Sequence, residues 1–333
     1  MNLGLELFFA AAAPAAAEVP AATGGLNLIH GFLLGALAVA VVLFTFDSRR
    51  PRLAKRYLRF LLLGCMAVLI LAPLVWIYCS IFKKNEVLMA YPFLPPLSKW
   101  GETLGLDNFR RLFTPRVSLQ GPIVFWQYML NSLFLASAAT MIQMFFCSLG
   151  GYALAKFRFN GRRQLMLFML GSMMLPGMLF LAPLFELMFR FGWIDTYLAL
   201  LIPGAATAFG IFLFRQAMQA VPDSLIEAAR VDGAGEFFIY WRIIMPLVQP
   251  MTAAFCLIVF MGQWNAFISP QIYLQSTYKL TVPVVLSQYM TQYAEDYGMF
   301  LAGTALAILP IAILFLALQR EFIAGLTSGA VKG

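Results

Sequence analysis

The sequence predicts an all-α, polytopic membrane protein. Of its 333 residues, 62% are hydrophobic and only 11% are charged, whereas ordinary soluble domains carry about 25% charged residues. Seven apolar runs each approach or exceed the roughly 20 residues that a bilayer-crossing helix needs, and lysine and arginine collect in alternate connections between the runs. These features exclude a soluble enzyme, a secreted disulfide scaffold and a nucleic-acid-binding module, although the net charge is +8.

The apolar runs define the expected spans. Several contain proline or glycine, including Pro73, Pro176, Pro203 and Pro310. Neighbouring helices can satisfy the backbone groups that these residues free, so we expect kinked rather than broken spans. The runs lie at 28–46, 60–82, 125–150, 165–188, 196–221, 247–270 and 300–319.

The basic residues orient the chain. Most of the 23 lysines and arginines fall in the connection 49–59, the connection 156–163, the segment 215–242 and the C-terminal tail. Cytoplasmic loops are enriched in these residues. We therefore expect this side to be cytoplasmic, with the N-terminus outside and the C-terminus inside a cell inner membrane.

The N-terminal region divides into two parts. Residues 1–25 form an Ala-rich leader, in which the small residues before Glu18 are typical of a signal-peptidase site. No positive charge precedes the apolar stretch, which favours a mobile or interfacial leader over a cleaved signal. Residues 26–59 hold the first apolar run and a basic cytoplasmic loop.

The sequence offers no catalytic constellation. Its four cysteines lie in apolar runs without C-x-x-C spacing, and His30 is the single histidine, which argues against a thiolate metal site and against the H-E-x-x-H zinc motif. No lysine follows a glycine as the P-loop requires. We expect no metal, no cofactor and no bond chemistry in this chain.

Residues 222–246 carry the most specific pattern. Pro222 and Asp223 are typical of a helix start, with Asp223 as the N-cap, and a short helix is expected over 224–231. Gly233 and Gly235 then permit a turn with positive φ before a second, amphipathic helix. We predict a helix-turn-helix elbow parallel to the membrane, which exposes the small side chains of Ala228 and Ala229 to a partner protein.

This segment resembles the EAA loop of the membrane subunits of binding-protein-dependent ABC importers. Six residues match in register: Glu227, Ala228, Ala229, Gly233, Ile243 and Pro246. Met245 replaces the usual leucine. Further segments are similar to the sugar-importing branch of this family, in particular to permease subunits like the G subunit of the maltose transporter. These segments are 106–109, 131–133, 151–155, 264–265 and 325–333.

The resemblance implies an architecture and a set of partners. It implies a six-span type I permease core within 60–320, one extra N-terminal span and a cytoplasmic tail over 321–333. The partners would be membrane lipid, a second permease subunit, an extracytoplasmic sugar-binding protein and two subunits that bind ATP. The implied ATPase-coupling residues are Glu227, Ala228, Ala229, Asp232, Gly233 and Pro246, and the implied tail contacts are Leu326, Thr327, Gly329 and Lys332.

The substrate path is expected near polar and aromatic residues of the spans, because sugars are bound by amides and aromatic faces. The candidates are Asn131, Gln263, Trp264 and Asn265. The alternative is that they only hydrogen-bond neighbouring helices.

Two other functions remain open at this stage. A permease for a non-sugar solute would share every motif named above. An ion-coupled carrier would place ionisable residues inside its spans. The apolar runs hold few such residues, and the single acidic one, Glu186, lies close to a predicted end.

Overall fold

The computed structural model describes residues 51–118, 121–291 and 296–330, together with Gly35 and Val39. The Ala-rich leader and the expected span 28–46 therefore lie outside the described residues. The chain divides into two compact units, Met1–Gly105 and Leu106–Gly333, and each is described here by itself.

The first unit is dominated by the helix α3, Pro51–Ser80. Proline suits the first turn of a helix because its missing N–H would have no partner there. The part Lys55–Ser80 is long and apolar enough to cross a membrane. Short 3-10 helices at Asn85–Val87 and Leu97–Lys99 and the helix α4, Trp100–Thr103, follow.

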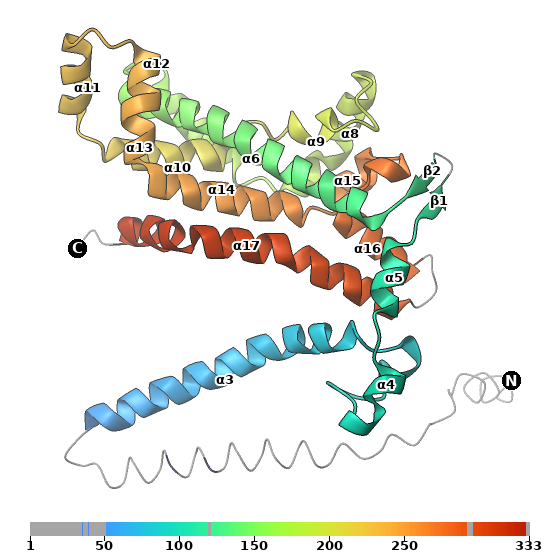
Figure 1. The fold of residues 1–333 in the computed structure, drawn as a ribbon. Coiled ribbons are helices and arrows are strands. Elements are labelled where there is room, and N and C mark those ends of the chain that lie inside the picture. Colours follow the sequence, from blue (N-terminus) through green and yellow to red (C-terminus); the bar gives the residue numbers. More distant parts are fainter. Residues whose placement is uncertain (1–34, 36–38, 40–50, 119–120, 292–295, 331–333) are drawn as a thin grey trace, which may run out of the picture. The chain divides into compact units, whose positions relative to one another are not determined.

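The second unit is built around the 32-residue helix α6, Phe125–Lys156. It lies against α10 (Ala208–Gln219) and α14 (Gln249–Trp264), and α14 lies against α17 (Tyr297–Ala330) (Figure 1). A Cβ on Gly151 would lie 2.5 Å from the Cβ of Phe214. Glycine is therefore required at this close contact between α6 and α10, as small residues are in packed membrane helices.

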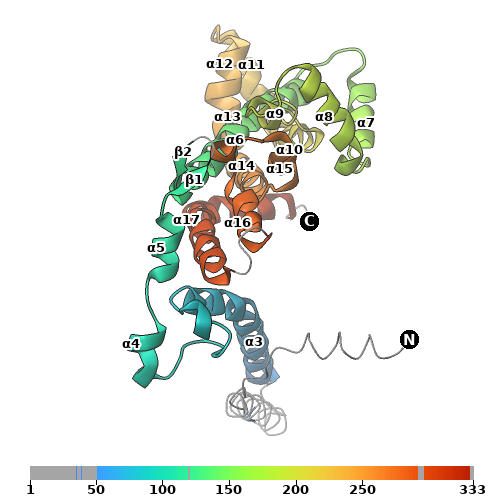
Figure 2. The ribbon, with the colours of Figure 1, turned by 90° about the vertical axis from the view of Figure 1, so that its right-hand side faces the viewer.

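Shorter elements surround these four helices. Two strands form an antiparallel hairpin in which Arg116 faces Ile123. Figure 2 shows the helices α7 and α8 next to each other at one side of the unit. The elements are α5 (Asp107–Phe113), β1 (Arg116–Ser118), β2 (Gly121–Ile123), α7 (Arg162–Ser172), a 3-10 turn (Gly177–Phe180), α8 (Leu181–Arg190), α9 (Leu198–Leu201), α15 (Ile268–Tyr273), a 3-10 turn (Thr277–Lys279) and α16 (Val282–Thr291).

The spans are less continuous than the sequence predicts. Within the described residues, three helices are long and apolar enough to cross a membrane, or up to five if each of two bent helix pairs forms one span. The expected span 165–188 is one such pair, bent by 94° between Ser172 and Gly177. Pro73 and Pro310, by contrast, lie inside continuous helices, as expected.

The expectation of one continuous span over 196–221 is wrong. The segment forms the four-residue helix α9, a break at Pro203 and Gly204, and the 12-residue helix α10. Thr207 restarts the helix, because its side chain accepts a hydrogen bond from the amide of Gly210. A helix of this length spans about 18 Å, which is less than the roughly 30 Å of a bilayer core.

Candidate coupling site

The predicted helix-turn-helix is present at residues 222–247, which we call the coupling elbow. Its first helix is α11, Asp223–Val231. Its second begins as α12 (Glu236–Phe238) and continues through a π-helical turn (Ile239–Ile244) into α13 (Met245–Leu247). This second segment meets α14 at an angle of 84°. Figure 1 shows α11 and α12 side by side at one end of the second unit.

Gly233 forms the turn between the two helices, with φ of +81°. Its amide donates to the carbonyl of Arg230 at 3.0 Å, and the amide of Ala234 donates to the carbonyl of Ala229 at 2.9 Å. This pair of bonds is the Schellman motif, which ends a helix with a left-handed residue. The positive φ expected from the sequence is confirmed at Gly233, whereas Gly235 has φ of −73°.

The expected N-cap role of Asp223 is wrong. Pro222 holds the N-cap position, no side chain caps the helix, and Asp223 is the first helical residue. Its carboxylate accepts a hydrogen bond from the Nζ of Lys156 at 2.6 Å. That bond and the positive charge of Lys156 lower the pKa of Asp223. The carboxylate of Asp223 is therefore bonded to a lysine distant in sequence rather than to the amides at the start of α11.

One face of α6 holds the coupling elbow through three polar side chains. These side chains recur every four residues, so they project from the same side of the helix. The hydroxyls of Ser148 and Tyr240 lie 2.7 Å apart, the hydroxyl of Tyr152 donates to Glu236 at 3.0 Å, and Lys156 donates to Asp223 at 2.6 Å. We call Ser148, Tyr152 and Lys156 the α6 ladder.

A further ion pair joins the two helices of the elbow to each other. Arg230, in the last turn of α11, donates from Nε to the second carboxylate oxygen of Glu236 at 2.8 Å. The hydrogen bond from Arg230 and the hydroxyl of Tyr152 therefore meet on one carboxylate. Glu236 thus joins α11, α12 and α6.

An apolar core lies beneath the ladder contacts. Ile226 and Ala229 of α11 are buried with Ile239 and Tyr240 of the π-helical turn. Ile226 and Ala229 are three residues apart, so they share the inner face of the helix. The expectation that both alanines are exposed is therefore wrong for Ala229, which is 9% exposed, and holds for Ala228.

The other predicted coupling residues lie at the surface. Glu227, Asp232, Gly233 and Pro246 are all exposed. Sequence analysis missed Ser148, Tyr152, Lys156, Arg230 and Glu236. The signal available for the first three was a polar residue at every fourth position near the end of an apolar helix.

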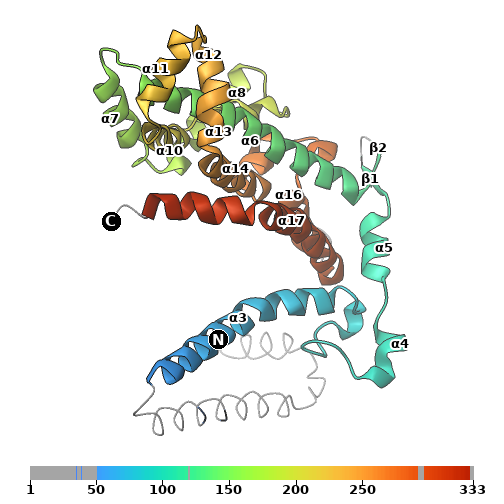
Figure 3. The ribbon, with the colours of Figure 1, turned by 60° about the vertical axis from the view of Figure 1, so that its left-hand side comes forward.

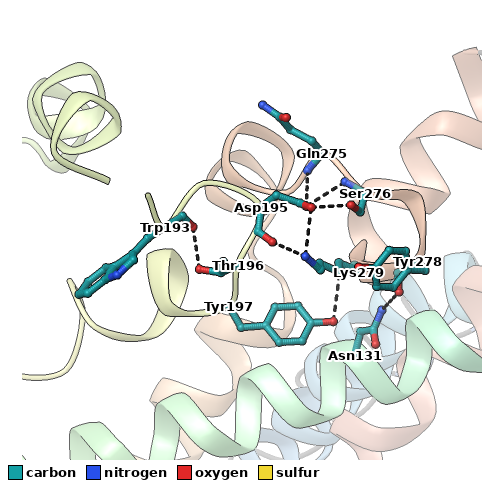
Figure 4. Close-up of polar contacts among 9 residues, drawn as sticks. All are labelled: Asn131, Trp193, Asp195, Thr196, Tyr197, Gln275, Ser276, Tyr278 and Lys279. Carbon is teal, nitrogen blue, oxygen red and sulfur yellow. Dashed lines mark hydrogen bonds and ion pairs between the residues drawn. The ribbon is translucent and has the colours of Figure 1, made fainter. Parts of the chain in front are cut away.

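Three of the four substrate-path candidates donate hydrogen bonds to carbonyls of the chain itself. Trp264 is 2% exposed, and its indole N–H donates to the carbonyl of Ala307 at 3.1 Å. The amide of Asn131 donates to the carbonyl of Tyr278 at 2.7 Å (Figure 4) and to the carbonyl of Leu280 at 3.0 Å. These contacts fit the packing alternative. Asn265 is exposed and donates to the carbonyl of Met261.

Gln263 differs from its neighbours because it lines a cavity of about 350 Å³. Gly204, Ser269 and Thr281 also line this cavity. The hydroxyl oxygen of Thr281 is buried and has no hydrogen-bond partner among the described residues. The cavity thus offers an amide and a free hydroxyl to a polar solute.

A second polar cluster lies in the connections before α9 and before α16. Asp195 is a non-glycine residue with φ of +60°, and its carboxylate accepts from the amides of Gln275 and Ser276, at 3.0 and 2.9 Å, and from Lys279 (Figure 4). Burial opposes ionisation, but these bonds together with the Ser276 hydroxyl lower the pKa of Asp195 to about 2. The charged carboxylate therefore fastens the two connections together.

The predicted tail contacts fall at the end of α17. Leu326, Thr327 and Gly329 belong to this helix, which continues to Ala330 rather than ending near Gln319. Lys332 lies outside the described residues.

Residues 147–324 match the family described as the binding-protein-dependent transport system inner membrane component. The chain belongs to this family. The matched region contains the α6 ladder, the coupling elbow and Gln263, whereas Asn131 and the helix α3 precede it. As a member of this family of membrane components, the chain is an ABC transporter permease.

Other permeases resemble the chain over most of its length. The arabinooligosaccharides transport system permease protein AraQ of Halalkalibacterium halodurans is 37% identical over 69% of this chain and 81% of its own length. The maltodextrin transport system permease protein MdxG of Bacillus subtilis is 31% identical over 86% of this chain and its full length.

A solved structure shares the fold. The chain is similar to a chain in the crystal structure of a bacterial ABC transporter involved in the import of the acidic polysaccharide alginate, with a TM-score of 0.71. The match covers 83% of this chain and 98% of the other, at 24% identity.

Proposed function

We propose that this chain is the membrane-spanning permease subunit of an ATP-driven importer for a sugar or oligosaccharide. The observation that carries the proposal is the coupling elbow, which exposes an outer face and is joined to the long helix α6 by the three ladder contacts. Relatives that transport arabinooligosaccharides and maltodextrin support the substrate class.

The assembled importer contains partners of four kinds. They are a second permease subunit, two ATP-binding subunits, an extracytoplasmic sugar-binding protein and the surrounding lipid. ATP is bound by the ATP-binding subunits, so this chain needs no cofactor and catalyses no reaction. The coupling elbow and the C-terminus of the chain face the cytoplasm.

The coupling elbow transmits motion as a rigid element. Glu227 and Ala228 sit on the exposed face of α11, where a small side chain beside a charge allows close approach of an ATP-binding subunit. Closure of the two ATP-binding subunits moves the elbow, and the α6 ladder makes α6 move with it. Such rigid-body movement is a common form of switching in proteins.

The solute route passes the cavity that Gln263 lines. Gln263 and Thr281 present an amide and a hydroxyl there, and both can exchange hydrogen bonds with sugar hydroxyls. Asn131 and Trp264 support the walls of the route through their bonds to Tyr278 and Ala307. Asn265 remains a candidate at the surface.

The test uses two substitutions in the coupling elbow. Glu227→Lys reverses the exposed charge, and Gly233→Asp adds a side chain at positive φ. Both are expected to leave the permease inserted in the membrane but to abolish ATP-driven uptake, because the ATP-binding subunits are lost from washed membranes. Glu102→Lys, at an exposed residue of the first unit, is the matched charge-reversal control. Normal uptake with retained ATP-binding subunits in both variants would refute the coupling role.

The alternatives are separated by purification of the intact assembly. Co-purification with a second permease and ATP-binding subunits supports an ABC importer, while a self-sufficient oligomer that transports without ATP would identify an ion-coupled carrier. If the partner binding protein retains a non-sugar solute, the assignment as an ABC importer stands and only the substrate class changes. Measurement of the saccharide that this binding protein retains names the substrate.

A further inference from the structure

A basic cavity of about 480 Å³ opens between the start of α7 and the later part of α10. The two helices contact each other, and Figure 3 shows them side by side. The lining residues are neutral or basic, and they include the three arginines Arg162, Arg163 and Arg215. The basic residues of the sequence place this part of the chain on the cytoplasmic side.

The arginines of this cavity are poorly balanced by the chain itself. The Nε of Arg215 is buried without a hydrogen-bond partner among the described residues. Arg162 makes long contacts to backbone carbonyls, at 3.3 Å to Phe157 and 3.5 Å to Ala155, and its charge repels that of Arg215. An unpaired buried donor carries a free-energy cost that an anion would remove.

The first turn of α7 adds further donors to the cavity. Gly161, with φ of +89°, is the N-cap of this 11-residue helix, and the first turn has neither a capping side chain nor an acidic residue. Amides at a helix N-terminus point toward the preceding space and favour an anion there. The backbone and the three guanidinium groups thus act on the same cavity.

An apolar surface continues from the cavity along α7. Met166 and Leu167 are part of the lining. On α7, Leu167 and Phe168 are 59% and 75% exposed, and Phe159, which precedes the helix and also lines the cavity, is 44% exposed. A free inorganic anion would leave these side chains uncovered, whereas the acyl chains of a lipid would cover them.

We propose that this cavity binds the phosphodiester headgroup of an anionic phospholipid from the cytoplasmic leaflet. The phosphate oxygens accept from Arg162, Arg163 and Arg215, and the acyl chains lie along the exposed apolar face of α7. Basic pockets between membrane helices are suited to such headgroups. The bound lipid would join α7 to α10, the helix that precedes the coupling elbow.

The test measures lipid retention by the whole importer. The purified complex is stripped of lipid in detergent, incubated with phosphatidylglycerol, phosphatidylcholine or inorganic phosphate, and examined by native mass spectrometry. We compare the wild type with the triple variant R162Q/R163Q/R215Q. The single variant Arg163→Gln, at an exposed position, guards against misfolding of the triple variant. R56Q/R59Q/R158Q removes three basic residues outside the cavity lining and is the matched charge control.

The wild type and the charge control should retain phosphatidylglycerol. Relative to the wild type, the affinity for this lipid should fall about tenfold in Arg163→Gln and further in the triple variant, as expected when a charge-assisted hydrogen bond is lost. Phosphatidylcholine should bind more weakly, and millimolar inorganic phosphate should not displace the lipid. Displacement by inorganic phosphate would overturn the lipid assignment in favour of a free anion. Equal retention of phosphatidylglycerol by the variants and the charge control would also overturn the proposal.

Discussion

The ammonium group of Lys156 lies 2.6 Å from the carboxylate of Asp223 and 2.6 Å from the carbonyl oxygen of Val221. The two partners are very unequal in exposure, because the side chain of Lys156 is 4% exposed and that of Asp223 is 73% exposed. A buried charge depends on its partners far more than an exposed one does. Of these two residues, the lysine therefore matters more for the connection between α6 and the coupling elbow.

Substitution of Lys156 should uncouple the elbow from α6. Lys156→Met keeps an unbranched side chain but removes both hydrogen bonds, and we expect ATP-driven uptake to fall about tenfold, which corresponds to the loss of a charge-assisted hydrogen bond. Asp223→Asn keeps an acceptor for the lysine and should change uptake less than about twofold. Uptake is measured in proteoliposomes that contain the assembled importer. Equal effects of the two substitutions would contradict this unequal dependence.

The two glycines of the elbow turn should respond differently to alanine. A Cβ at Gly233 or at Gly235 would meet no atom within 4 Å, so only the backbone conformation separates them. Gly233→Ala should destabilise the elbow by about 1 kcal/mol because φ is +81°. Gly235→Ala should be tolerated at φ of −73°. Hydrogen exchange of residues 223–238 in the two variants measures the difference, and faster exchange in Gly235→Ala alone would contradict the assignment.

The charged form of Asp195 should stabilise the protein at neutral pH. Its folded pKa of about 2 lies below the usual value of about 3.9, so this stabilisation is complete above about pH 5 and is lost progressively as pH falls to 2. Asp195→Asn tolerates the positive φ but removes the charge, and it should cost about 2 kcal/mol at pH 7. Thermal unfolding of both proteins from pH 3 to 7 should show a difference that is constant above about pH 5 and shrinks in acid. A constant difference throughout would exclude the carboxylate as its source.

The sequence located the parts of the coupling elbow that depend on local chemistry. Gly233 was predicted to have positive φ because few other residues adopt it readily, and α11 was predicted to within about one residue. The inner face of α11 was harder to assign. Ala229 is buried because Ile239 and Tyr240 fold back over it, and the π-helical turn that positions them has no local sequence signature.

The missed features depend on residues distant in sequence. Lys156 was interpreted only as a positive charge that orients the membrane topology, yet it holds a helix that begins 67 positions later. Hydropathy also could not separate a continuous span from the break at Pro203 and Gly204, because the residues on both sides are equally apolar. Trp264 was selected for its aromatic face, which is buried in stacking against Phe260 at 5.9 Å.

Truncation of the C-terminus should weaken coupling between ATP hydrolysis and uptake. Residues 326–330 form the end of α17, so deletion of 326–333 shortens a helix as well as removing the tail. We expect more ATP hydrolysed per solute imported, with normal assembly of the complex. Deletion of residues 331–333 alone is the control for the final residues. An unchanged ratio of hydrolysis to uptake after the longer deletion would assign the tail no coupling role.

Gln263 and Trp264 should have separable effects although they are neighbours. Gln263 lines the 350 Å³ cavity, so Gln263→Leu should raise the KM for uptake while the thermal unfolding midpoint stays near the wild-type value. Trp264 is buried and its N–H is bonded to Ala307, so Trp264→Phe leaves that carbonyl without its donor and should lower stability by about 1–3 kcal/mol with KM unchanged. Both properties are measured on the assembled importer supplied with its loaded binding protein. If Trp264→Phe shifted KM and Gln263→Leu did not, the solute would pass the indole ring rather than the cavity.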